Sequence, residues 1–158
     1  MSTKLSTTLL VTLTLAAGFA SSGTRAADLP GRHPAYLHAL SDLYLARWNL
    51  EHRPGDAAVS GQEDIAITEI DRAIQEARRA AGDDGKNVNE HPHEDAVLDH
   101  PGRLRHALDL LHSARADLHE REDNPETRNR RDLSAGHIDT ALRATEQAIK
   151  DFEHEHHR

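Results

Sequence analysis

The 158-residue sequence contains no cysteine, and its single methionine is Met1. Without thiols the chain can form no disulfide, no thiolate metal site, no c-type haem attachment and no thiol nucleophile. Aromatic residues are also scarce, with one Trp, two Tyr and two Phe, which is thin for binding a flat aromatic ligand. Any chemistry must therefore come from oxygen and nitrogen side chains.

Signatures of catalysis are missing as well. The sequence contains no Gly-rich phosphate loop, no nucleophile elbow and no credible Ser-His-Asp triad. Haem b would need two histidines facing a roomy core, whereas helical projection puts His106, His112 and His119 on the flanks of their helix. We therefore expect neither an enzyme nor a haem protein.

Long apolar runs are limited to one segment near the N-terminus. Residues 9–20 have the length of a signal-peptide core and are too short to span a bilayer as a helix. Lys4 precedes this segment, and small residues at Thr24 and Ala26 fit a cleavage site. The sequence predicts a signal peptide over residues 1–26, cleaved near Ala26, and a periplasmic domain over 27–158 with no membrane segment.

Basic residues are outnumbered by acidic ones, and the formal net charge is −8. Nucleic acids and anionic membranes attract proteins with a basic face, so we expect neither as a partner. The residue in excess is histidine: the chain has 13, about one in ten of the residues after the signal peptide.

The rest of the sequence contains an internal repeat. Residues 38–53 (HALSDLYLARWNLEHR) and 106–121 (HALDLLHSARADLHER) match at eight of sixteen positions with an offset of 68. The offset continues where EIDRAI at 69–74 is aligned with HIDTAL at 137–142. Because a repeat of this kind is usually one supersecondary unit, it predicts two α-hairpins in tandem.

Apolar residues recur at spacings of three and four in four segments, as expected for amphipathic helices. Their predicted core positions are Tyr36, Leu37, Leu40, Leu43, Ala46 and Leu50; Ile67, Ile70, Ala73, Ile74 and Ala77; Leu104, Leu108, Leu111, Ala114 and Leu118; and Leu133, Ile138, Ala141, Leu142, Ala148, Ile149 and Phe152. The sequence predicts an all-α fold, an antiparallel four-helix bundle with hairpins at 34–82 and 101–153, a link at 83–100 and a histidine-rich tail at 154–158.

Several residues mark helix ends. Ser60 with Glu63 forms a capping-box pattern, and Asn124 followed by Pro125 is typical of a helix start. Gly136 is a point at which the last helix is expected to be interrupted.

Charged residues also repeat. Arg47 matches Arg115, and Asp71 matches Asp139. This pattern favours a structural ion pair between neighbouring helices, and the simpler alternative is surface charge on a helix flank.

Histidine concentrates in two segments that also carry acidic residues. Neutral imidazole and carboxylates bind Cu²⁺, Ni²⁺ and Zn²⁺, and Cu(I) is disfavoured without sulfur. The predicted metal ligands in the link are Glu90, His91, His93, Glu94, Asp95 and His100, and those in the tail are His154, His156 and His157. The structural alternatives are a solvated acidic loop and a frayed chain end.

Residues 137–150 (HIDTALRATEQAIK) and 69–81 (EIDRAIQEARRAA) resemble the small histidine-rich metal-binding proteins of bacterial periplasms. Those proteins carry a signal peptide, lack cysteine and form alanine-rich helical bundles. The resemblance implies binding of divalent copper and similar ions, and it transfers the class of function without particular ligands.

Two functions follow as expectations. The first is periplasmic binding or buffering of divalent copper, nickel or zinc through His and carboxylate side chains. The alternative is a non-enzymatic structural module that presents helix faces to a periplasmic protein partner or to a second copy, with Tyr44 and Trp48 in the contact.

Overall fold

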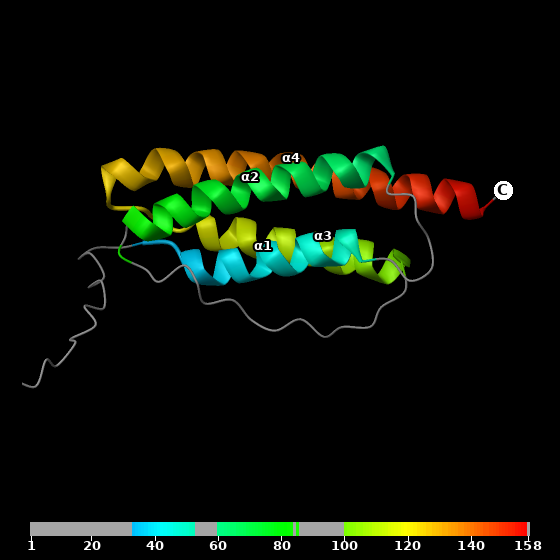
Figure 1. Ribbon diagram of the computed structural model, residues 1–158, viewed down its shortest axis with the longest axis horizontal. Coiled ribbons are helices and arrows are strands. Elements are labelled where there is room, and N and C mark those ends of the chain that lie inside the picture. Colours follow the sequence, from blue (N-terminus) through cyan, green and yellow to red (C-terminus); the bar gives the residue numbers. More distant parts are fainter. Residues whose placement is uncertain (1–32, 53–59, 84, 86–99, 158) are drawn as a thin grey trace, which may run out of the picture.

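The computed structural model describes residues 33–52, 60–83, 85 and 100–157. These residues form four helices and no strand: α1 (Tyr36–Glu51), α2 (Gly61–Asp83), α3 (His100–Leu118) and α4 (Pro125–His156) (Figure 1). The predicted all-α class is therefore confirmed, and the arrangement is compatible with a helical bundle. Within the described ranges, no helix combines the length and the apolar character needed to cross a bilayer.

The helices lie in two layers. Helix α2 runs along α4, and α1 runs along α3 (Figure 1). Contacts of α1 with α2 and of α3 with α4 join the layers, while the described backbones of α1 and α4, and of α2 and α3, do not approach each other closely. The order around the bundle is therefore α1, α2, α4, α3, with one core between the four helices.

Leucine, isoleucine and alanine fill this core, as predicted. Leu43, Leu111 and Ile138 are fully buried, and many of the buried positions are alanine. Leu133, by contrast, is 47% exposed, so its assignment to the core was wrong. The buried side of α4 includes Ser134, whose Oγ donates to the Ala73 carbonyl oxygen at 2.9 Å. Leu133 precedes Ser134 by one residue, which turns its side chain about 100° away from that side.

The helix ends follow the predicted caps. The Ser60 amide donates to Glu63 Oε2 at 2.8 Å, and the Glu63 amide donates to Ser60 Oγ at 3.3 Å. Asn124 Oδ1 accepts from the Glu126 amide at 3.0 Å, with Pro125 in the first turn. Helix α4 is continuous through Gly136, so the expected interruption does not occur, and the helix extends to His156.

Both repeated ion pairs form, which confirms that prediction. Arg47 Nε lies 2.6 Å from Asp71 Oδ1 and joins α1 to α2, and Arg115 Nε lies 2.8 Å from Asp139 Oδ1 and joins α3 to α4. All four side chains are at least 30% exposed, so each pair contributes only about 0–1 kcal/mol.

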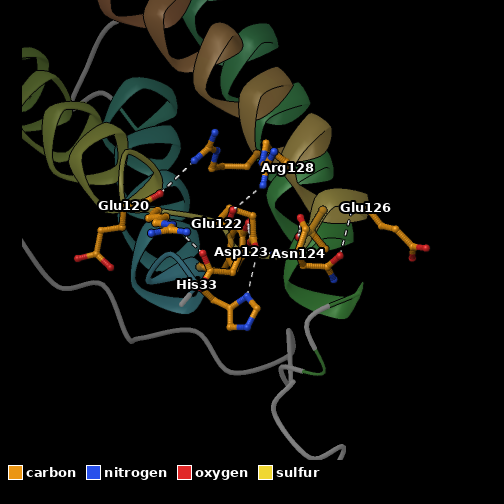
Figure 2. A network of polar contacts seen from close by, with 11 residues as sticks. His33, Glu120, Glu122, Asp123, Asn124, Glu126 and Arg128 are labelled. Carbon is orange, nitrogen blue, oxygen red and sulfur yellow. Dashed lines mark hydrogen bonds and ion pairs between the residues drawn. The ribbon is translucent and has the colours of Figure 1, made fainter. Parts of the chain in front are cut away.

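A buried carboxylate, Glu122, joins the segment before α1 to the connection between α3 and α4 (Figure 2). Tyr36 Oη donates to Glu122 Oε2 at 2.5 Å, and His33 Nδ1 lies 2.9 Å from Oε1. The Asn124 amide also donates to Oε1 at 2.7 Å. The Glu122 side chain is fully buried, so these contacts replace the water that it gives up.

The environment of Glu122 determines its charge. Burial acts to raise the pKa of Glu122, but hydrogen bonds from Tyr36 and the Asn124 amide, with those from His33 and Thr127, outweigh burial and lower it. A carboxyl whose pKa is lower in the folded than in the unfolded chain stabilises the fold above its unfolded pKa of about 4.3. That stabilisation is lost as the pH falls through the folded value.

We expect Glu122→Gln to lower the free energy of unfolding at pH 7 by about 1–3 kcal/mol, because an amide cannot accept from all of these donors. Tyr36→Phe removes a single donor and should cost less. Urea unfolding at pH 7 and below pH 4 measures both effects, and the Gln variant should lose less stability on acidification than the wild-type protein.

Glu120→Gln is the matched control, since the Glu120 side chain is exposed and the bond that Glu120 accepts, from Arg131 Nη1, goes to its backbone carbonyl oxygen. This variant should unfold like the wild-type protein. Equal stability of Glu122→Gln and wild type at pH 7 would show that the buried network does not anchor the chain.

Candidate metal centre

Three potential metal ligands meet where the beginning of α1 lies against the end of α3: His38, Asp42 and Asp117. His38 and Asp42 are four residues apart on α1, so one turn of helix places them on the same side. Asp117 is 79 residues from His38 in sequence and comes from the last turn of α3. The group therefore depends on the packing of α1 against α3.

The donor atoms of the three side chains all lie within 4.8 Å of one another. His38 Nδ1 is 2.6 Å from Asp117 Oδ2. A transition-metal ion bonded to both atoms at about 2.0–2.2 Å would take the place of the bridging proton and widen this separation. The His38 side chain is 64% exposed and has room to make that adjustment.

Asp42 is the buried member of the group. The residue is 8% exposed, and its Oδ2 atom has no hydrogen-bond partner among the residues that the structure describes. Burying a carboxylate is unfavourable unless a donor or an opposite charge compensates for the lost water. The Asp42 Oδ2 atom is therefore free to accept a bond from a cation or from a hydrogen-bond donor such as water.

The two acidic residues also act on the histidine. The hydrogen bond with Asp117, together with the negative charges of Asp117 and Asp42, raises the pKa of His38 above 6.5, and slight burial opposes this only weakly. A histidine with a raised folded pKa stabilises the fold below the unfolded value near 6.5 and loses that effect as the pH rises through the folded value. The same attraction for positive charge favours a metal ion.

The predicted link ligands Glu90, His91, His93, Glu94 and Asp95 lie outside the described residues. His100 is the first residue of α3, and its side chain also lies outside what the structure describes. The link site therefore stays a prediction.

The predicted tail ligands are described, and all three are exposed. His156 stacks on Phe152, with ring centroids 4.0 Å apart, and its Nδ1 lies 2.9 Å from the Phe152 carbonyl oxygen. His154 and His157 line a shallow hollow beside Glu153, whose carboxylate is 3.2 Å from Arg105 Nη2. Within the described part of the chain, the tail histidines do not come together as three ligands.

The helix histidines lie away from the core, as predicted. His112 and His119 are exposed, and His106 is half-buried. His137 Nδ1 contacts Glu69 Oε2 at 2.7 Å across α2 and α4. The sequence did not single out the group at His38, although the spacing of His38 and Asp42 was a local signal for it.

Comparison of this chain with protein-family models, with curated proteins and with solved structures gave no match. The resemblance to small periplasmic metal-binding proteins is therefore a prediction that these comparisons do not support. The function of the group at His38 is therefore argued from its residues and their contacts.

We expect the imidazole of His38 to titrate above pH 6.5 in metal-free protein, and we expect Asp117→Asn to lower that value because the neighbouring negative charge is removed. NMR titration of the histidine ring signals measures both. Asp109→Asn, on an exposed position of α3, is the control and should leave His38 unchanged. A wild-type value at or below 6.5 would mean that His38 does not contact Asp117 in solution.

Proposed function

We propose that this protein binds a divalent transition-metal ion at His38, Asp42 and Asp117 and serves as a periplasmic metal-binding or metal-buffering protein, not as an enzyme. One observation supports this most: three side chains suited to such ions converge, and the buried Asp42 has an acceptor without a donor among the described residues. The excess of histidine and the net negative charge agree with it.

The ligand set limits which ions suit the site. One imidazole and two carboxylates favour Zn²⁺, Ni²⁺ and Cu²⁺, and the absence of sulfur disfavours Cu(I). Neutral imidazole is needed for coordination, so protons compete with the ion and affinity should fall in acid.

Exposure of the site favours reversible binding. Three protein ligands leave at least one coordination position of a four-coordinate ion to water, and His38 lies at the surface. An ion held in this way can exchange with the surroundings, which suits a buffer better than a closed structural site.

We further propose that the bundle is antiparallel and consists of two tandem hairpins, α1 with α2 and α3 with α4. In support, the ion pairs Arg47–Asp71 and Arg115–Asp139 are equivalent under the offset of 68 and occupy equivalent helix pairs. The contact of His38 with Asp117 brings the start of α1 to the end of α3, as antiparallel packing requires.

A second candidate function is the presentation of a helix face to a protein partner. Ile65 and Leu133 are 46% and 47% exposed, and they are equivalent under the same offset. Trp48 is stacked on His52 and Tyr44 Oη accepts from Arg78, so the aromatic residues predicted for such a contact have partners within the chain. This function needs no ion, so a metal titration separates it from the first.

Calorimetric titration of protein purified without a histidine tag tests the proposal with Zn²⁺, Ni²⁺ and Cu²⁺. His38→Ala, Asp42→Asn and Asp117→Asn should each weaken the tightest binding at least about tenfold, which corresponds to about 1.4 kcal/mol. At a hundredfold excess over the dissociation constant, the ion should stabilise the fold by about 2.7 kcal/mol.

His112→Ala is the matched control, because it removes an exposed histidine of α3 outside the group. Two further variants test the other predicted ligands in the same titration. One combines His91→Ala with His93→Ala, and the other lacks residues 154–158. If only these last two changes reduce binding while His38→Ala keeps wild-type affinity, the ion is held by the link or the tail and the site at His38 is rejected.

A further inference from the structure

The metal centre has an incomplete counterpart under the offset of 68. His38 corresponds to His106, but Asp42 corresponds to Leu110, and Asp117 corresponds to Asn49. Each of the two positions thus has the histidine, but only the position at His38 has the two carboxylates.

Contacts between the halves indicate where that counterpart lies. Glu69 and His137 are equivalent residues, and they contact each other at 2.7 Å across α2 and α4. A contact between two equivalent residues agrees with a two-fold relation between the halves whose axis passes close to Glu69 and His137. Under that relation, the counterpart of the contact between His38 and Asp117 would be His106 with Asn49, at the opposite end of the α1–α3 pair.

Asn49 retains the polar character expected at such a position. The residue is 1% exposed, and its Nδ2 donates to the Leu45 carbonyl oxygen at 2.8 Å. Its Oδ1 is buried without a hydrogen-bond partner in the part of the chain that the structure describes. Leu110, in the place of the second carboxylate, is partly buried against the core.

We propose that the α1–α3 pair binds one divalent transition-metal ion, at His38, and that His106 with Asn49 is an incomplete second site that lacks only its two carboxylates. This inference rests on the proposed function of the His38 site. An imidazole and a neutral amide supply too little negative charge to hold the ion, whereas two aspartates would complete the set that His38 has.

Titration with Zn²⁺, followed by NMR of the histidine ring signals, reports on both sites separately. In the wild-type protein, His38 should respond at low Zn²⁺ and His106 should not. In Asn49→Asp with Leu110→Asp, His106 should respond as well, with an affinity at least about tenfold above that of the wild-type position. Adding His106→Ala to this variant should remove the new binding event and leave His38 unchanged.

Loss of Leu110 can impair folding, so the reverse exchange is made in parallel. Asp42→Leu with Asp117→Asn gives the first site the composition of the second, and His38 should then stop responding while the helical circular dichroism is kept. A response of His38 in this folded variant would overturn the inference, because it would show that the carboxylates do not distinguish the two sites.

The remaining outcomes separate the two proposals. A folded Asn49→Asp, Leu110→Asp variant in which only His38 responds overturns the incomplete second site and leaves the proposed function intact. An equal response of His38 and His106 in the wild-type protein also overturns it, since the second site would be complete already. A wild-type His38 that does not respond at all rejects the proposed function and this inference together.

Discussion

The packing of α1 against α3 is the constraint on which the candidate site depends. His38 and Asp42 come from α1 and Asp117 comes from α3. The three side chains therefore meet only when these two helices pack side by side. Fully buried alanines on both helices, among them Ala39 and Ala107, allow close approach, since small side chains reduce the distance between helix axes. With no cysteine in the chain, the geometry of the site depends on noncovalent packing.

Much of the fold could be predicted because its signals are local. The spacing of leucine and alanine along each helix, the Ser60–Glu63 cap and the Asn124 cap all act within a few residues. The failures have local causes too. Leu133 has apolar chemistry but lies one residue away from the buried side of α4, and Gly136 weakens a helix without breaking it when its neighbours Ala135 and His137 are packed or paired.

The site was harder to predict because its signal is not density of histidine along the chain. His38 and Asp42 form an ordinary pair at a spacing of four, and Asp117 joins this group of potential ligands only through a contact across 79 residues. Histidine-rich segments attract attention in a sequence, yet the exposed histidines at the end of α4 do not converge in the described structure. The pairing of the helices decides which potential ligands come together. The repeat offset alone does not predict that pairing.

The features of the site share one requirement, which is a positive charge close to the two carboxylates. Asp42 is a buried carboxylate with one oxygen unpaired among the described residues, and Asp117 places a second carboxylate beside it. Two adjacent negative charges repel each other unless a positive charge lies between or beside them. The hydrogen bond of His38 with Asp117 and the negative charges of Asp117 and Asp42 favour the charged imidazole and raise the pKa of His38. In the proposed site, a divalent ion would supply more positive charge and would also bond the unpaired Asp42 oxygen. If the proposed site binds an ion, proton and metal ion would compete for His38, and binding of the ion would release the proton.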